Sequence, residues 1–141
     1  MYGAYDLILH EYGPENHVGS VHVEIPDTLT ADEIDLLERR LAAAVYAEHG
    51  VILAGIGIYS VNTKDDELKQ LRTDVTHLIS AHEGVLQIHG FYANRDTHTV
   101  SVDIILDFGL PDREAAFEAI RKELAEAFPE WSFIMTMDLD T

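Results

Sequence analysis

Four residues in the second half of the chain are of the types that bind divalent cations in proteins: His89, Asp103, Asp138 and Asp140. One imidazole and three carboxylates suit zinc, and a set this rich in oxygen also admits manganese or iron(II). Carboxylates that gather at one place repel one another and hold their protons more strongly unless a cation relieves the repulsion. These residue types therefore predict a divalent metal site, with zinc as the first expected ion, if the fold brings them together.

The spacing of these residues is that of one face of a β-sheet. Asp138 and Asp140 alternate with Met137 on the last predicted strand, so both aspartates point to the face opposite the apolar core. A second interpretation stays open at this point. Alternate residues of an amphipathic sheet are polar in any case, and these aspartates, with Asp107, would then only face solvent.

The elements that must position these residues follow from hydrophobic periodicity and turn signals. In the first half we expect strands at 5–10 and 19–25, a helix from Thr30 to His49 and a strand at 51–61. In the second half we expect a helix with its core face over 68–79, strands at 85–93 and 99–108, a helix from Asp112 and a strand at 131–139. Thr30 with Glu33 forms a capping box, and Gly50 is placed to end the first helix.

The two halves repeat the same order of elements. Ser20-Val21-His22 and Ser101-Val102-Asp103 share one register at an offset of 81 positions (101 − 20). This predicts an α+β fold of two ferredoxin-like units, 1–62 and 63–141, in which the first lacks the leading helix of the second. An alternative division uses 51–61 as the first strand of a complete β-α-β-β-α-β unit, with the earlier residues as an added hairpin and helix.

Composition limits the classes of partner. The 141 residues include 26 acidic and 9 basic side chains, a formal net charge of −17, which repels nucleic acid and anionic lipid surfaces. Cysteine is absent, so metal ligation would use His, Asp and Glu. Apolar runs stay short of the ~18 to 20 residues that span a bilayer, and the first residues do not resemble a signal peptide, so we expect a soluble chain.

The chain carries none of the common catalytic motifs. The G-x-S-x-G, P-loop, H-E-x-x-H and Rossmann glycine patterns do not occur, and Gly55-Ile56-Gly57 alone indicates only a flat strand. Nothing in the sequence indicates a nucleophile or a deep pocket beside His89. We therefore expect that the protein is not an enzyme.

Two hairpin segments carry a resemblance to a known family. YDLILHEYGP followed by GSVHVEIPDTLT resembles the cytoplasmic C-terminal, dimerisation domain of cation diffusion facilitator (cation efflux) transporters. The resemblance extends over essentially the whole chain as two domains in tandem. It implies two metallochaperone-like α-β-β-α-β folds and a homodimer. It also implies that the chain lies at the cytoplasmic face of the cell membrane, next to a transmembrane domain of the same transporter.

The resemblance also implies ligand positions. In the second unit, Asp138 and Asp140 stand where the family has an H-x-D pair, and Asp103 replaces the histidine of the second strand. In the first unit, His22 matches that histidine and Asp35 falls at the helix ligand position. The first unit has a depleted set, because Tyr5 occupies the ligand position of the first strand and Gly57 and Tyr59 occupy those of the last strand.

The function predicted by these features is a cytosolic regulatory and dimerisation region of a divalent cation efflux transporter, which binds or senses metal to control transport. The alternative is a structural dimerisation module that binds no metal, which the depleted first unit favours. A third hypothesis is a free-standing ferredoxin-like domain that senses a small molecule.

Overall fold

The computed structural model describes residues 1–138, so Leu139, Asp140 and Thr141 lie outside the described residues. Contacts within the chain divide it into two compact units, Met1–Tyr59 and a second that begins at Ser60. Among the described residues, no helix combines the length and the apolar character of a membrane span.

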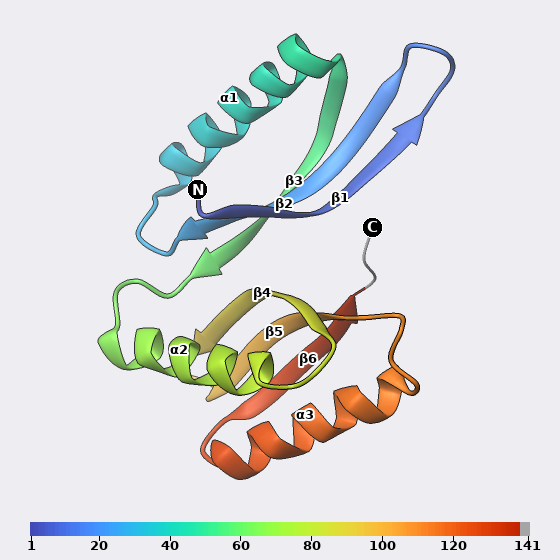
Figure 1. Cartoon of the computed structure of the whole chain (residues 1–141). Helices are drawn as coiled ribbons and strands as arrows, with labels where there is room; N and C mark the ends of the chain where they lie inside the picture. Colours follow the sequence, from blue (N-terminus) through green and yellow to red (C-terminus); the bar gives the residue numbers. More distant parts are fainter. Residues whose placement is uncertain (139–141) are drawn as a thin grey trace. The chain divides into compact units, whose positions relative to one another are not determined.

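The first unit contains three strands and one helix (Figure 1). In chain order its elements are β1 (Gly3–Glu11), β2 (His17–Pro26), α1 (Ala31–His49) and β3 (Val51–Val61). The sheet has the order β1-β2-β3, and β1 and β2 pair antiparallel. The helix stands between the second and third strands in sequence, as the periodicity predicts.

The second unit has the same order of elements after one additional helix (Figure 1). Its elements are α2 (Asp66–Ser80), β4 (Val85–Asn94), β5 (Thr99–Leu106), α3 (Arg113–Ala127) and β6 (Ser132–Asp138). The sheet has the order β4-β5-β6, with β4 and β5 antiparallel and β5 and β6 parallel. The predicted α+β class, with two three-stranded sheets and a helix between strands of each, is confirmed.

Local capping fixes where the helices begin and end. The Thr30 hydroxyl accepts a hydrogen bond from the Glu33 amide at 3.3 Å, and Gly50 ends α1 in the left-handed conformation at φ 67°. Asp65 and Asp112 cap α2 and α3 in the same way, through their carboxylates. These caps satisfy amides that the first turn of a helix leaves without partners.

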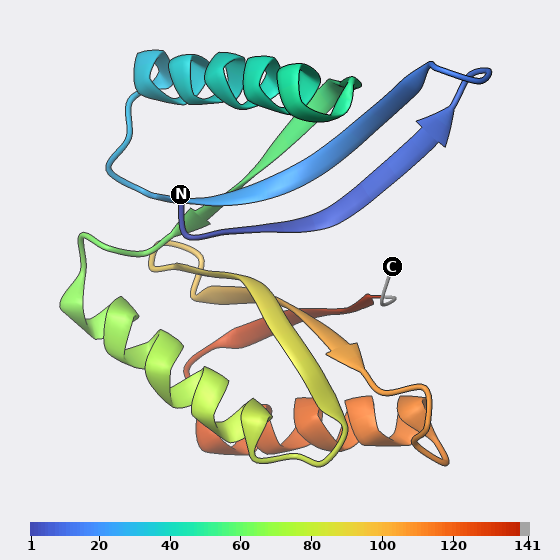
Figure 2. The same cartoon turned by 45° about the horizontal axis from the view of Figure 1, so that its top comes forward.

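The core of the second unit lies between its sheet and its two helices. Figure 2 shows α2 and α3 on one side of the β4-β5-β6 sheet. The helices bury aliphatic and aromatic side chains there: Leu68, Leu71, Val75 and Ile79 from α2, and Phe117, Ile120 and Leu124 from α3. Val100, Val102 and Ile104 of β5 face them and are fully buried. Side chains on the other face of β5, such as Asp103, therefore point away from the helices.

The two hairpins match residue by residue. Tyr5 lies opposite His22 in the first, and His89 lies opposite Asp103 in the second. The register then shifts at the same place in both, between Tyr5 and Ile8 and between His89 and Tyr92. Inside this irregularity the backbone is left-handed in both copies, at Asp6 (φ 58°) and at Gly90 (φ 65°). The internal repeat predicted from the sequence is thus present in the strand pairing, with offsets of 84 for the first strand (89 − 5) and 81 for the second (103 − 22).

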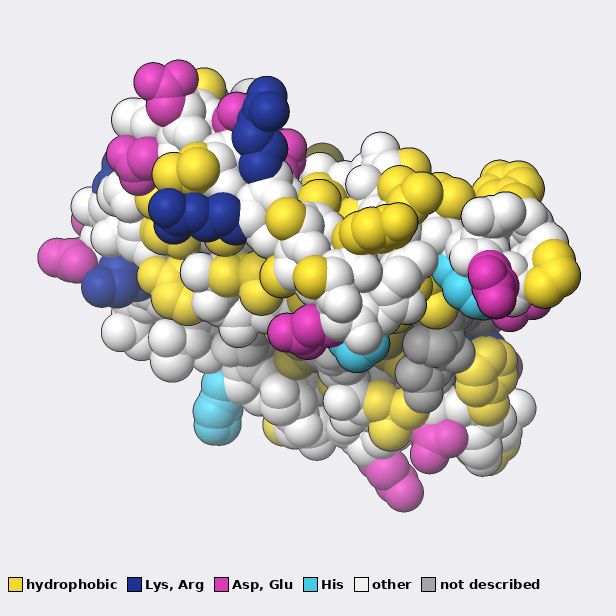
Figure 3. Space-filling view, turned by 90° about the horizontal axis from the view of Figure 1, so that it is seen from above, with side chains coloured by type: hydrophobic (Ala, Val, Ile, Leu, Met, Phe, Trp, Pro, Cys, Tyr) yellow, Lys and Arg dark blue, Asp and Glu magenta, His cyan; other side chains and the backbone are white. Residues whose placement is uncertain are grey.

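Packing in the first unit is looser than in the second. None of the residues of α1, all of which the structure describes, is buried. Leu7 and Leu9 of β1 are 50% and 53% exposed, whereas Phe91 and Ala93, at the matching positions of β4, are 4% and 1% exposed. Figure 3 shows contiguous groups of hydrophobic side chains on the surface that it presents. The difference arises because α2 covers β4 in the second unit, whereas the described part of the first unit contains no matching helix to cover β1.

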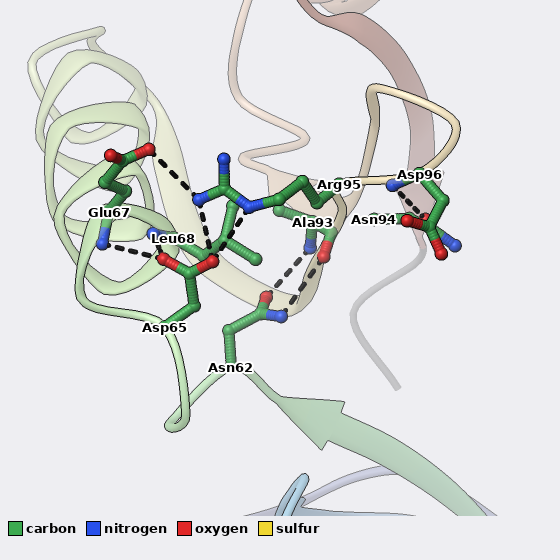
Figure 4. A network of polar contacts seen from close by, with 8 residues as sticks. All are labelled: Asn62, Asp65, Glu67, Leu68, Ala93, Asn94, Arg95 and Asp96. Carbon is green, nitrogen blue, oxygen red and sulfur yellow. Dashed lines mark hydrogen bonds and ion pairs between the residues drawn. The ribbon is translucent and has the colours of Figure 1, made fainter.

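Polar contacts order the start of the second unit (Figure 4). The buried Asn62 side chain donates to the Ala93 carbonyl at 3.1 Å and accepts from the Ala93 amide at 2.9 Å. It therefore makes the pair of hydrogen bonds that a neighbouring strand would make to β4. Nearby, the Arg95 guanidinium lies 2.7 Å from Asp65 and 3.0 Å from Glu67. These contacts tie the cap of α2 to the end of β4.

This ion pair predicts a pH dependence of stability. The hydrogen bond from Arg95 lowers the pKa of Asp65 below its ordinary value of 3.8, with further hydrogen bonds from the Leu68 and Glu67 amides. Because the pKa is lower in the folded state, the stabilisation is complete above the unfolded value and is lost as the pH falls through the folded one. We expect the stability difference between wild type and Arg95→Gln in urea unfolding to be constant from about pH 8 to pH 5 and to narrow below about pH 4. Sodium chloride at about 1 M should reduce this stability difference at pH 7, since solvent reaches both side chains, which are 48% (Arg95) and 34% (Asp65) exposed. A difference independent of pH down to about pH 2 would contradict the assignment.

Candidate metal centre

Three neighbouring strands of the second unit each supply one potential ligand. His89 comes from β4, Asp103 from β5 and Asp138 from β6. His89 and Asp103 lie directly opposite each other in the antiparallel pair. In the parallel pair Asp103 lies opposite Thr136, so Asp138 stands two residues farther along the same face.

The three side chains share the face of the sheet that α2 and α3 do not cover. Val102 and Ile104, on either side of Asp103 in sequence, belong to the core beneath the helices. Met135 belongs to the same core and Met137 packs against it, which directs Asp138 to the opposite face. The strand alternation seen in the sequence thus predicts the direction of each ligand.

The distances bring three ligand atoms to one place. His89 Nε2 lies 3.0 Å from Asp138 Oδ2 and 3.7 Å from Asp103 Oδ2. The ligand atoms of the three residues all lie within 4.8 Å of one another. Two ligands at about 2.1 Å from one zinc ion with a tetrahedral angle are roughly 3.4 Å apart. The observed separations therefore need only small side-chain adjustments to surround one ion.

The chemistry of the donor set fits a divalent cation. One imidazole nitrogen and two carboxylate oxygens suit zinc, manganese and iron(II), and a set of three protein ligands leaves further positions for water. His89 Nε2 and Asp138 Oδ2 lie within hydrogen-bond distance of each other. A cation at this place would relieve the repulsion between the two carboxylates.

Asp140 was predicted as a fourth ligand of this site. It lies outside the described residues, so its prediction remains untested. The described set is therefore His89, Asp103 and Asp138.

The predicted ligand His22 has a different environment in the first unit. Its Nδ1 lies 3.1 Å from a carboxylate oxygen of Asp6, and its ring stacks on Tyr59 with 4.6 Å between centroids. The Tyr59 hydroxyl donates to the same Asp6 oxygen at 2.6 Å. A Cβ added to Gly57 would lie 2.5 Å from His22 Nε2, so glycine at this position makes room for the ring.

The structure does not bring Asp35 to His22. Asp35 lies on α1, where it accepts a hydrogen bond from Arg39 at 2.8 Å. The helix faces the side of the sheet that carries Val21, since Val21 and Leu41 line a common cavity. His22 follows Val21 in β2 and points to the other side. These two predicted ligands therefore do not form one site.

Sequence reasoning missed Asp6 as a partner of His22. The repeat offered one signal. Asp6 corresponds to Gly90 at the offset of 84 (90 − 6), and a glycine inside a strand often marks an irregular backbone that redirects a side chain. Aspartate tolerates the left-handed conformation better than most residues other than glycine. A carboxylate can therefore occupy a bulge where the second unit has no side chain.

Comparison of the chain with protein-family models, with curated proteins and with solved structures found no match.

Proposed function

We propose that the chain is a divalent cation-binding protein that holds its ion at His89, Asp103 and Asp138. The observation that carries this proposal is the convergence of three ligand atoms from three strands within 4.8 Å. The ligand set combines one histidine nitrogen with two aspartate oxygens, and a nitrogen ligand favours a transition metal over calcium or magnesium. Zinc is the first candidate, and manganese or iron(II) are the others.

The finer proposal is that the two units are ferredoxin-like and form the cytosolic regulatory and dimerisation region of a divalent cation efflux transporter. The hairpin motifs YDL and SVHVE support it, as does the α-β-β-α-β order of the second unit. In this proposal the chain forms a homodimer at the cytoplasmic face of the membrane and is joined to a transmembrane domain.

Metal could regulate such a dimer by linkage. A cation that binds one arrangement of the dimer more tightly shifts the population toward it, by no more than the difference in affinity. A preference of ~100-fold supplies about 2.7 kcal/mol, which is enough to switch two arrangements of similar free energy. The three ligands would thus report the cytosolic cation concentration to the transporter.

A second candidate function is a structural dimerisation module that binds no metal. It is favoured by the His89–Asp138 hydrogen bond at 3.0 Å, because the two side chains then satisfy each other without an ion. The pairing of His22 with Asp6 and Tyr59 is of the same kind. In this alternative, both polar clusters only stabilise the fold.

The two candidates differ in their response to metal. The chain, stripped with a chelator, should be melted with zinc, manganese, calcium or magnesium, and sedimented with and without zinc. We expect zinc at about 100 times its dissociation constant to raise the melting temperature by about 10 °C or more, since this concentration contributes about 2.7 kcal/mol to a unit of this size. Zinc should also favour the dimer. Equal melting curves with and without every ion would leave the structural module as the function, and a thermal shift without a change in sedimentation would remove only the regulatory proposal.

A further inference from the structure

An apolar cavity lies in the first unit between α1 and the β1-β2-β3 sheet. Its volume is about 400 Å³. Its lining includes Leu7 and Leu9 of β1, Val21 of β2, and Leu41, Val45 and His49 of α1. Apart from His49 these side chains are aliphatic, so the cavity presents an apolar surface along one side of the helix.

The second unit shows what covers the matching surface. Leu7 and Leu9 correspond to Phe91 and Ala93 at the offset of 84 (91 − 7 and 93 − 9) set by the paired hairpins. In the second unit these positions lie in the core to which α2 contributes Leu68 and Val75, among others. α1 corresponds to α3, and the described first unit has no helix that corresponds to α2. The cavity therefore lies where a second helix packs in the repeated unit.

We propose that this groove binds an amphipathic α-helix of a partner protein. α2 indicates the pattern of such a helix, because its buried residues, Leu68, Leu71, Val75 and Ile79, follow the spacing i, i+3, i+7 and i+11. The partner helix places aliphatic side chains at this spacing over Leu7, Leu9 and Leu41. The inference does not depend on metal binding by the second unit.

Charge determines the polar face of the partner helix. The residues Met1–Tyr59 include ten acidic and two basic side chains, a net charge of −8 (2 − 10). A helix with Lys and Arg on its polar face is attracted to this unit, whereas α2 of a second copy, with three acidic and two basic side chains, offers no such attraction. That helix would also have to leave the core of its own unit. A basic amphipathic helix is therefore the occupant that the groove favours.

The test uses a labelled peptide with the sequence of residues 65–81 in which Asp66, Glu67 and Asp74 are replaced by Lys. Fluorescence anisotropy with the full chain should give saturable binding with a dissociation constant of tens of micromolar or lower. Leu41→Glu should weaken binding at least 10-fold, because it places a charge in the groove. Leu36→Glu is the matched control on the same helix, since Leu36 is 48% exposed and does not line the cavity, and it should bind as wild type does.

A second variant tests the groove without a change in α1. Leu9 lies on β1 and is already 53% exposed, so Leu9→Asp should not disturb folding and should also weaken binding at least 10-fold. A second peptide, with the same lysines but with serine at the four aliphatic positions, should not bind. The proposal is overturned if the first peptide does not bind, if both groove variants bind it as well as wild type, or if the serine peptide binds equally. It is also overturned if the chain forms a dimer that Leu41→Glu and Leu9→Asp dissociate, since the occupant would then be a second copy.

Discussion

Asp138→Asn should remove most of the stabilisation that zinc gives to the chain. The substitution keeps the size of the side chain but replaces a carboxylate that lies 3.0 Å from His89 Nε2 with a neutral amide. We expect the zinc dissociation constant, measured by isothermal titration calorimetry with a competing chelator, to rise at least about 100-fold, which corresponds to about 2.7 kcal/mol. His89→Ala should have an effect of similar size, because it removes the only nitrogen ligand of the three.

The metal-free variants separate a metal site from a structural hydrogen bond. Asp103→Asn keeps the size of the side chain but removes the charge of one of the two carboxylates near His89, so it should also weaken zinc binding. Asp74→Asn, on the exposed side of α2, is the control and should change neither zinc binding nor the stability of the metal-free chain. If Asp138→Asn destabilised the metal-free chain by about 1 kcal/mol and zinc binding were unchanged, the pair would be structural only.

Phe91→Ala should destabilise the second unit by about 3 to 5 kcal/mol, whereas Leu7→Ala should cost the first unit less than about 1 kcal/mol. The two residues occupy matching positions of the paired hairpins, but Phe91 is 4% exposed and Leu7 is 50% exposed. The cost of removing a side chain follows the contacts that it loses and the cavity that it leaves. Urea unfolding monitored by far-ultraviolet circular dichroism and by Trp131 fluorescence would measure both effects.

These measurements also indicate whether the groove is free in solution. The two units can unfold in separate transitions, so each substitution should be assigned to the transition whose midpoint it moves. A cost of several kcal/mol for Leu7→Ala in the isolated chain would mean that Leu7 is covered in solution. That result would contradict the open groove on which the partner helix depends.

The order of elements and their repetition could be predicted from local patterns. The capping box at Thr30 and the alternation in β2 and β6 each predict one element, because the period of a helix or strand is set by the backbone alone. The direction of His89, Asp103 and Asp138 follows from the same alternation. Their common location also depends on the registers of β4 against β5 and of β5 against β6, which the local patterns do not determine and the structure supplies.

Other features of the candidate sites could not be predicted from such patterns. The left-handed conformation of Asp6 is unusual for a residue within a strand, and a regular alternation would assign its side chain incorrectly. The contact of Asp6 with Tyr59 joins residues 53 positions apart, so it depends on β1 and β3 both pairing with β2 in the sheet. The prediction that Asp35 lies beside His22 was wrong because α1, which carries Asp35, packs on one face of the sheet and His22 points to the other.

The origin of the three ligands has a kinetic consequence. His89 and Asp138 are 49 residues apart in sequence and meet only after α3 has carried the chain across to the parallel strand. Contacts of such long range form late in folding, because the intervening chain must first be ordered. A cation held by these residues should therefore slow unfolding and leave the rate of folding almost unchanged. The ion would stabilise the folded unit after it has formed and would take no part in the folding nucleus.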